Sequence, residues 1–203
     1  MAKKRVPWEE YLDKISDMLD TLTDEQRENL LEHVSVVKFK KNEIIYKEGD
    51  LPTNLLCLVS GKVKIYKDGV GGRPQIMRVL GETEYFAYRA YMADEPFITA
   101  AAAFEPCVVL KIPLGIIVKT IQENARLGWF FIQRLAHDLG QSDERTVNLT
   151  QKHIRGRLAE SLLFLKESYG LEEDGSTLSI YMSREDLANL SNMTTSNAIR
   201  TLS

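Results

Sequence analysis

Residues 125–149 read ARLGWFFIQRLAHDLGQSDERTVNL, a run long enough for about seven turns of one α-helix. Steps of three and four residues along this run trace the heptad spacing with which two helices wind around each other. The spacing therefore predicts a dimer. Ser142 and Thr146 make the second half of the seam polar, so a ligand or a change of register could act there. The expected dimer seam is Ala125, Gly128, Ile132, Leu135, Leu139, Ser142, Thr146 and Leu149.

The composition sets wide limits around this helix. The chain has 203 residues, of which 44% are hydrophobic, and a formal net charge of -3. This charge argues against a protein that coats nucleic acid through bulk positive charge, but it leaves room for a local basic surface. No stretch approaches the roughly 18 to 20 apolar residues of a membrane span, so we expect a cytoplasmic protein without a membrane partner. Cys57 and Cys107 each stand alone, which predicts neither a disulfide nor a metal site.

The region before the long helix carries the signals of short strands. Several runs are rich in β-branched and aromatic residues, and turn residues separate them at intervals of roughly 10 to 12 residues, a rhythm typical of a sandwich or barrel. Ahead of them, amphipathic spacing over 8–22 and a capping box at Thr23 and Gln26 predict two helices. The expected strands are 36–39, 43–46, 55–59, 63–66, 75–80, 99–104 and 108–112.

Two segments interrupt the strand pattern. Residues 84–92 read as a single helical turn inserted between strands, and insertions of this kind often carry function. The glycine-rich segment 68–72 could be a phosphate cradle or a hairpin turn. A phosphate cradle leads from a strand into a helix N-terminus, whereas strands flank this segment on both sides. The hairpin turn is therefore favoured.

The region after the long helix is mostly helical. Its apolar residues restart in a new phase at Ile154, so residues 150–153 are expected to form a hinge. The segment 178–181 alternates between apolar and polar residues like a short strand.

The end of the chain has the pattern of a helix-turn-helix. Ser183 caps one helix, a tight turn follows at 191–193, and Thr194 caps a second helix over 195–202. If the free face of the second helix enters a DNA major groove, Arg200 can bind guanine through two hydrogen bonds. A helical hairpin with an ordinary polar surface is the alternative. The candidate DNA-contacting residues are Thr194, Thr195, Ser196, Asn197, Ile199 and Arg200.

Together, the turns at Gly49, Gly61 and Gly81, the long helix and the 182–202 pattern resemble the cyclic-AMP receptor protein and fumarate-nitrate regulator (CRP/FNR) family. The resemblance implies a bacterial homodimer that binds near-palindromic double-stranded DNA, contacts RNA polymerase and regulates transcription in response to an effector. An enzyme is not expected, because no nucleophile, base and orienting residue cluster by motif and no metal spacing appears in the sequence. The implied α+β fold has three parts: an N-terminal double-stranded β-roll of the cyclic-nucleotide-binding, jelly-roll type (1–124), a dimerisation helix (125–149) and a C-terminal winged helix-turn-helix (150–203).

The resemblance fails where relatives hold cyclic AMP. They bind its phosphate with a Gly-Glu pair in the helical insertion and an Arg-Ser or Arg-Thr pair at the next strand. This chain has Ala87-Tyr88 and Ile98-Thr99 there, so we do not expect tight cyclic-AMP binding. Arg89 either replaces the missing arginine or forms a salt bridge. In relatives, the positions that Ser142 and Asp143 match meet the adenine across the dimer. For Ser142, plain packing in the seam is the alternative. The candidate effector pocket is Tyr85, Phe86, Ala87, Tyr88, Arg89, Ile98, Thr99, Ser142 and Asp143.

Other cofactors of the family are not favoured. An iron-sulfur cluster needs about four cysteine ligands, and this chain has two cysteines far apart in sequence. Haem needs an axial ligand, and His137 is the only histidine on the long helix. The effector therefore remains unidentified.

The end of the sequence departs from the family as well. The chain stops at Ser203, where the family continues into a two-stranded wing, and acidic and basic residues nearly balance over 150–203. We therefore expect this sequence to represent part of a longer regulator whose further residues supply phosphate contacts. Thr195 and Ser196 stand where relatives commonly place Arg and Glu, so a different operator is expected. If the natural chain ends at Ser203, the alternative is a dimeric ligand-sensing or protein-interaction module that does not bind DNA.

Overall fold

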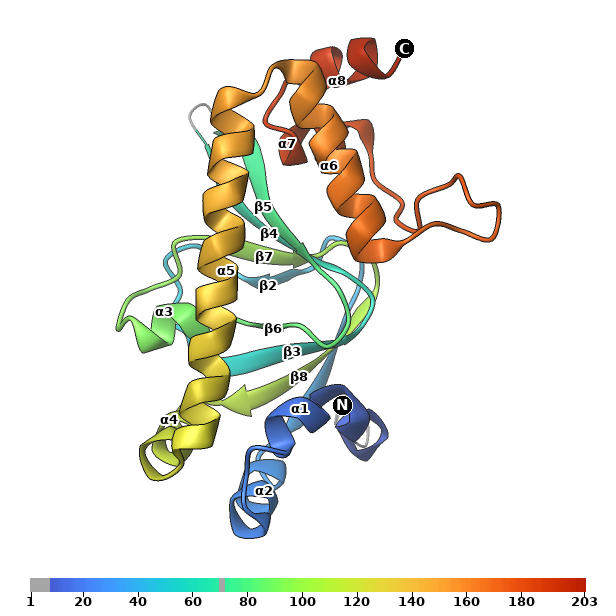
Figure 1. The fold of residues 1–203 in the computed structure, drawn as a ribbon. Helices are drawn as coiled ribbons and strands as arrows, with labels where there is room; N and C mark the ends of the chain where they lie inside the picture. Colours follow the sequence, from blue (N-terminus) through green and yellow to red (C-terminus); the bar gives the residue numbers. More distant parts are fainter. Residues whose placement is uncertain (1–7, 70–71) are drawn as a thin grey trace. The chain divides into compact units, whose positions relative to one another are not determined.

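The computed structural model describes residues 8–69 and 72–203 (Figure 1). It consists of two compact units. Unit 1 is formed by the residues up to Ile65 together with Val79–His137, and unit 2 by Tyr66–Arg78 together with Asp138–Ser203. Two strands and the long helix run from one unit into the other. The domain boundaries expected at residues 124 and 149 stay a prediction.

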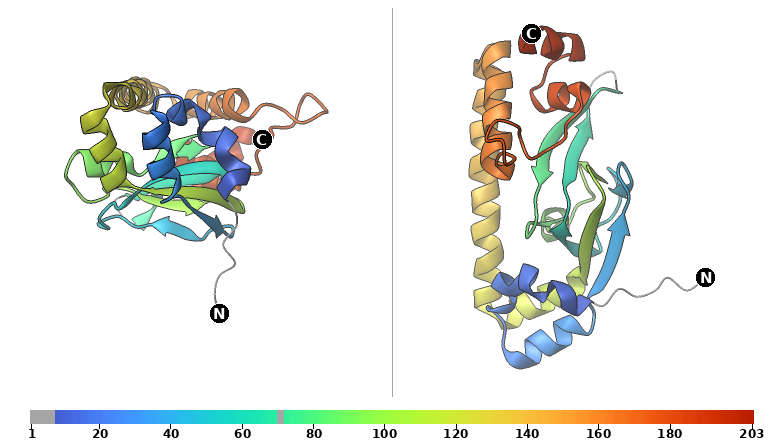
Figure 2. Two further views of the ribbon diagram at one scale, coloured as in Figure 1. Left: turned by 90° about the horizontal axis from the view of Figure 1, so that it is seen from below. Right: turned by 90° about the vertical axis from the view of Figure 1, so that its right-hand side faces the viewer.

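Unit 1 begins with short helices. A 3-10 helix, η1 (Trp8–Ile15), leads into one turn of α-helix, α1 (Ser16–Leu19), so the single α-helix expected over 8–22 is wrong. A 3-10 helix has three residues per turn, which keeps Trp8 and Tyr11 on one side. The next helix, α2 (Asp24–Leu31), has the predicted capping box: the Gln26 amide donates to Thr23 Oγ1 at 3.3 Å, and the Thr23 amide donates to Gln26 Oε1 at 3.2 Å. In Figure 2, α1 and α2 lie beside the first turns of the long helix.

The strands form two four-stranded sheets, with the orders β1-β8-β3-β6 and β2-β7-β4-β5. Each of the seven runs before the long helix that the sequence marked as a strand contains one, and the expected β-roll is confirmed. β6 was not expected as a strand, because its two residues belong to the predicted insertion. The strands are β1 (Ser35–Phe39), β2 (Ile44–Tyr46), β3 (Asn54–Ser60), β4 (Val63–Asp68), β5 (Pro74–Leu80), β6 (Tyr85–Phe86), β7 (Ala100–Ala103) and β8 (Cys107–Pro113).

β3 is buried on both faces, which explains its continuous apolar run. Successive side chains of a strand point to opposite faces. Leu56 and Leu58 therefore join the core between the sheets, whereas Leu55, Cys57 and Val59 join a second core with residues of the helices of unit 1.

The turn between β3 and β4 depends on Gly61. Its φ is +82°, and a Cβ at this position would lie 2.4 Å from the carbonyl oxygen of Pro106. Only glycine fits such a site. Between β4 and β5 the Gly69 amide donates to Arg73 O at 2.9 Å, which confirms the hairpin for the described residues. Val70 and Gly71, in the middle of the predicted glycine-rich turn, lie outside them.

The helices after the roll follow the predicted order. The long helix extends two residues beyond its expected end, so the hinge shortens to Lys152 and His153, and α6 runs back in the opposite direction (Figure 1). None of the described helices is long and apolar enough to cross a membrane. The helices are α3 (Tyr88–Met92), α4 (Leu114–Glu123), α5 (Ala125–Gln151), α6 (Ile154–Tyr169), α7 (Arg184–Leu190) and α8 (Thr195–Leu202).

The strand expected over 178–181 is wrong. Leu178 forms only an isolated bridge with Leu171, and the Glu172 amide donates to Thr177 O at 2.7 Å to close the loop between them. The alternating pattern was present, but a strand needs a neighbouring strand along its whole length to accept its hydrogen bonds.

Candidate functional site

The insertion between β5 and β7 places three aromatic residues, Tyr85, Phe86 and Tyr88, in the cores of unit 1. Tyr85 and Tyr88 are buried in the core beneath the helices, and Phe86 is buried between the sheets. Ala87 has a φ of 69°, a left-handed conformation that starts α3. Three of the residues expected to line an effector pocket thus pack inside the protein.

Tyr85 also takes part in a polar cluster. Its hydroxyl donates to Asp17 Oδ1 at 2.7 Å, and the guanidinium of Arg134 forms an ion pair with Asp17 Oδ2. Arg134 also stacks over the ring of Tyr85, 4.7 Å from its centre. Burial, with a smaller contribution from the nearby Cys57 and Asp17, holds the pKa of Tyr85 well above its usual value. The cluster joins α1, β6 and α5.

Ring contacts reinforce this connection to α5. The Tyr85 and Phe130 rings meet edge to face with centres 5.6 Å apart, and the Tyr88 and Phe131 rings lie 5.2 Å apart. Because both phenylalanines lie on α5, the first half of that helix is packed directly on the insertion that was expected to sense an effector.

Four of the remaining candidates for the effector pocket, Arg89, Ile98, Ser142 and Asp143, are exposed. Arg89 Nη1 pairs with Glu95 Oε1 at 2.6 Å, so Arg89 is found in the salt bridge that was the alternative. Ile98 is 51% exposed and carries no charge, and Thr99 is half-buried. Ser142 and Asp143 are exposed on α5 in unit 2.

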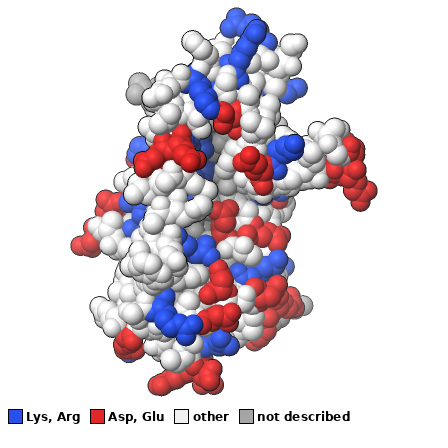
Figure 3. Space-filling model, viewed as in Figure 1, with Lys and Arg blue, Asp and Glu red and all other residues white. Residues whose placement is uncertain are grey.

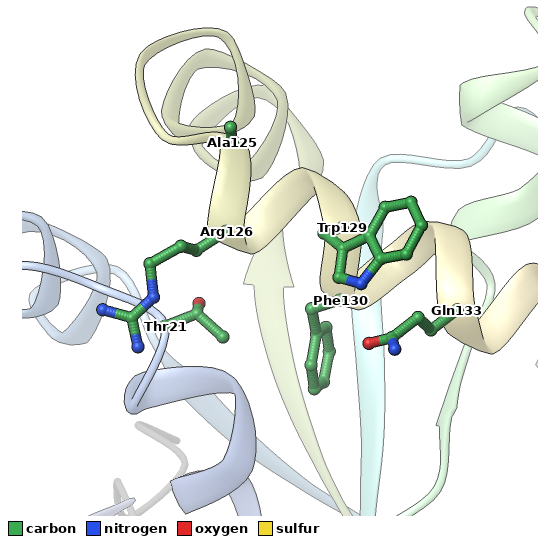
Figure 4. A pocket seen from close by; sticks show the side chains of 6 residues that line it. All are labelled: Thr21, Ala125, Arg126, Trp129, Phe130 and Gln133. Atoms are coloured by element: carbon green, nitrogen blue, oxygen red, sulfur yellow. The ribbon is translucent and has the colours of Figure 1, made fainter.

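The apolar surface of α5 follows a different line from the predicted seam. Leu135 packs against the core of unit 1, and Gly128 and Leu149 are half-buried. The exposed positions at heptad spacing are Trp129, Ile132, Ala136 and Leu139, which we call the exposed stripe. Ile132 and Leu139 belong to both lines. Figure 4 shows Trp129 beside a shallow depression of about 440 Å³ that Thr21, Ala125, Arg126, Phe130 and Gln133 also line.

Helices α7 and α8 form the predicted helix-turn-helix. The Asp186 amide donates to Ser183 Oγ at 2.9 Å and caps α7. The turn bends at Asn192, whose φ is 50°, and the Met193 amide donates to Ala188 O at 3.0 Å. Ala188 and Ala198 are fully buried, so the helices can cross closely.

The outer face of α8 is open to solvent. Thr194 Oγ1 accepts the Asn197 amide at 3.3 Å, and Arg200 Nη2 donates to Asn197 Oδ1 at 2.8 Å. Thr194, Thr195, Ser196, Ile199 and Arg200 are all exposed, whereas Asn197 is half-buried. Leu202, at the end of α8, is 37% exposed.

Comparison with known proteins extends this picture. The structure superposes on that of FixK2 from Bradyrhizobium japonicum with a TM-score of 0.74 and 22% identity, covering 83% of this chain and 82% of that one, which shows a shared fold. Residues 36–124 match the family described as the cyclic nucleotide-binding domain.

Two curated relatives match over 162 residues each. The chain is 22% identical to the CRP-like cAMP-activated global transcriptional regulator of Mycobacterium tuberculosis, covering 79% of this chain and 72% of that protein. It is 26% identical to the anaerobic regulatory protein of Bacillus subtilis, covering 78% of this chain and 68% of that protein. The chain belongs to the CRP/FNR family. The expected family, and with it a role in transcription regulation, is confirmed.

In this CRP/FNR protein, charge is segregated at the end of unit 2 that carries α8. Figure 3 shows Lys and Arg atoms over the end formed by α8 and the α5–α6 junction, whereas acidic atoms gather on the loop after α6. That loop carries Glu172, Glu173 and Asp174. The near-balance of charge over 150–203 therefore hides a local basic surface.

Sequence reasoning missed four side chains that connect elements. Asp17 and Arg134 belong to the Tyr85 cluster, and Gln75 and Arg145 bind main-chain oxygens of unit 2. Of these four residues, only the two arginines have a signal in the sequence. Arg134 and Arg145 lie at helical spacing from Phe131 and Leu149, on the inward side of α5. An arginine on the inward side of a helix predicts a partner but does not say which one.

Both cysteines of the protein are buried thiols. Burial raises the pKa of Cys57 to about 12 and that of Cys107 to about 11, from an ordinary value of 9.0. Both thiols are therefore protonated near neutral pH, in which form they are poor nucleophiles and poor metal ligands.

These thiols predict a loss of stability at alkaline pH. Unfolded cysteines release protons near pH 9.0, whereas folded Cys57 keeps its proton until about pH 12, so the unfolded state binds fewer protons between these values. The free energy of unfolding should therefore fall as the pH rises from about 9, as urea denaturation between pH 7 and 10 would measure. The free energy of unfolding of the Cys57→Ala variant should fall less than that of the wild type over this pH range. Equal pH slopes for the variant and the wild type would contradict the assignment.

Proposed function

We propose that this protein is a dimeric, sequence-specific DNA-binding transcription regulator whose β-roll responds to an effector other than cyclic AMP. The observation that carries the proposal is the capped, solvent-exposed face of α8 in a CRP/FNR chain. A helix that is held on one side by buried Ala198 and open on the other can enter a major groove without rearrangement.

The side chains of α8 match the chemistry of base edges and phosphates. Arg200 offers a planar fork of donors for guanine, and the hydroxyls of Thr195 and Ser196 can reach bases or phosphate oxygens. Thr194 lies at the helix N-terminus, where the free amides and the helix dipole favour a phosphate. Basic atoms over this end of unit 2 supply the sequence-independent attraction.

A two-fold dimer through α5 would place two such helices on DNA. Isolated exposed apolar residues are ordinary, but Trp129, Ile132 and Leu139 line up at heptad spacing, and Trp129 is 60% exposed and Leu139 63% exposed. A two-fold dimer reads two half-sites related by the same symmetry, spaced about one helical turn or a multiple of it apart. The operator is therefore expected to be near-palindromic. By family analogy, the bound dimer contacts RNA polymerase in a bacterial cytoplasm.

The insertion argues against cyclic AMP as the effector. A phosphodiester anion needs a positive partner in its pocket. Here Ile98 supplies none, Tyr88 is packed on Phe131, and Arg89 is paired with Glu95. An effector that acts at the insertion should therefore differ in chemistry from cyclic AMP.

Isothermal titration calorimetry with cyclic AMP should accordingly show no binding below about the millimolar range. The Glu95→Ala variant is the matched test of Arg89, because it releases the guanidinium from its ion pair without changing the core. It should also fail to bind. A micromolar dissociation constant for either protein would contradict this account of the insertion.

Selection of bound duplexes from a random DNA pool tests the proposed function. The expected product is a near-palindromic consensus, bound with an affinity that falls steeply as salt increases. If no sequence is enriched, with or without cell extract to supply the effector, the proposal is wrong and the protein-interaction module becomes the better account.

A further inference from the structure

In unit 2, one arginine bridges the β4–β5 hairpin and the helix-turn-helix. Arg145, on α5, donates from Nη2 to the carbonyl oxygen of Ile76 in β5 at 2.6 Å. The same nitrogen donates to the carbonyl oxygen of Leu190, the last residue of α7, at 3.0 Å. Three elements thus meet at one guanidinium.

The chemistry of this contact suits an arginine. The last carbonyls of a helix have no partner within the helix and carry partial negative charge, so a cation near them is favourable. Ile76 and Leu190 both accept through their main-chain oxygens. Burial lowers the pKa of Arg145 to about 10, which still leaves the side chain charged near neutral pH.

Further bonds join the β4–β5 hairpin to the helix-turn-helix and to α5. Gln75 Nε2 donates to Asn189 O in α7 at 2.5 Å, and Arg73 Nη2 lies 3.4 Å from Asn192 Oδ1 in the turn before α8. On α5, Asp138 pairs with Arg78 at 2.7 Å, about two helical turns before Arg145. β5 is therefore joined to α5 at two points and to the end of α7 through Gln75, and Arg73, just before β5, reaches the turn.

We propose that Arg145 is a positioning residue for DNA binding, which holds the α7–α8 turn in a set orientation against the β4–β5 hairpin. The proposal rests on the proposed function. The reading face of α8 is exposed, so the bridge does not cover it. Losing the bridge should therefore weaken DNA binding, because the free protein would have to order the turn when it binds.

Two variants separate geometry from charge. Arg145→Ala removes the bridge. Arg145→Lys keeps the positive charge but replaces a planar fork with a single ammonium group, which should restore only part of the affinity. Gln141→Ala is the control, since Gln141 is exposed on the same helix one turn earlier. Binding of the selected duplex is measured by fluorescence anisotropy at several salt concentrations.

Arg145→Ala should weaken binding about tenfold, the effect of losing one preorganising link. The slope of log affinity against log salt should stay that of the wild type, because Arg145 touches no phosphate. In free protein, amide hydrogen exchange should accelerate together in residues 75–78 and 189–193. If Arg145 had a purely local role, replacing it with alanine would accelerate hydrogen exchange only within α5.

Several results would overturn the proposal. Affinity within twofold of the wild type would show that the bridge does not position the reading helix. A salt slope lower by about one unit would make Arg145 a phosphate contact. Unchanged hydrogen exchange in both segments of Arg145→Ala would show that the bridge does not hold them in solution. If the wild type binds no duplex while exchange still rises in Arg145→Ala, the bridge exists but the proposed function and its DNA-positioning role both fail.

Discussion

Leu139→Glu should convert the protein from a dimer into a monomer. Leu139 is 63% exposed in the single chain and lies on the exposed stripe of α5. In a two-fold dimer the substitution enters twice, placing two carboxylates near the symmetry axis. Burying unpaired charges costs several kcal/mol, so a loss of about 4 kcal/mol, or a thousandfold rise in the dimer dissociation constant, is expected.

Sedimentation velocity over a dilution series measures this dissociation constant. Trp129 gives a second signal, because its emission should shift to longer wavelength when the dimer separates and the indole enters water. Gln141→Glu is the matched control: it adds the same charge to the same helix, but at an exposed position outside the exposed stripe. It should stay dimeric. Dimeric Leu139→Glu would show that the chains associate through another surface.

The choice of Leu139 depends on which line of α5 faces the partner. Leu135→Glu provides the comparison, since Leu135 belongs to the seam predicted from sequence but packs against the core of unit 1. That variant should lower the thermal midpoint of the monomer unit. Dissociation by Leu135→Glu without any loss of thermal stability would favour the predicted seam instead.

Arg200→Ala should remove much of the sequence specificity. A bidentate arginine–guanine contact is worth about 1 to 3 kcal/mol of discrimination, so affinity for the selected duplex should fall about 5- to 150-fold. Affinity for unrelated DNA should change far less. In the free chain Arg200 lies on the exposed face of α8, where its Nη2 donates to Asn197 Oδ1 at 2.8 Å.

Competition between selected and scrambled duplexes measures the effect. Arg200→Lys is the control for charge: it keeps the phosphate attraction but loses the planar fork, so it should bind scrambled DNA normally and discriminate poorly. Equal loss of affinity for both duplexes in Arg200→Ala would place Arg200 on a phosphate and contradict its role in base reading.

Local signals in the sequence predicted local structure well. The capping residues Thr23, Ser183 and Thr194 mark helix starts, and their side chains make the expected bonds. Gly61 marks a turn that no other residue fits. These predictions succeed because each depends on a few neighbouring residues whose chemistry permits one conformation.

Predictions that depended on distant partners were less complete. The heptad pattern identifies apolar residues of α5, but Leu135 reads the same whether it faces the core or a second chain. The bonds of Arg134 to Asp17 and of Arg145 to Ile76 span 117 and 69 residues of sequence. No spacing rule links such positions. The segment 178–181 had a strand pattern but found only one bridging partner, Leu171.

The same limit applies to the effector site. The sequence showed that Ile98 replaces the expected arginine, but only the structure shows that Tyr88 packs on Phe131 and that Arg89 pairs with Glu95. Packing of the insertion against α5 suggests how a ligand could act: displacing Tyr85 or Tyr88 would disturb their rings' contacts with the helix that carries the exposed stripe.

The most direct measurement of the central claim is the stoichiometry and salt dependence of the complex with a selected duplex. Sedimentation of the wild-type protein with a fluorescent duplex should give two chains per near-palindromic site. Its affinity should fall steeply with salt and stay unchanged when cyclic AMP is added at about millimolar concentration, far above the range of a specific effector. One chain per site, binding that does not distinguish the selected duplex from a scrambled one, or a large response to micromolar cyclic AMP would contradict the account.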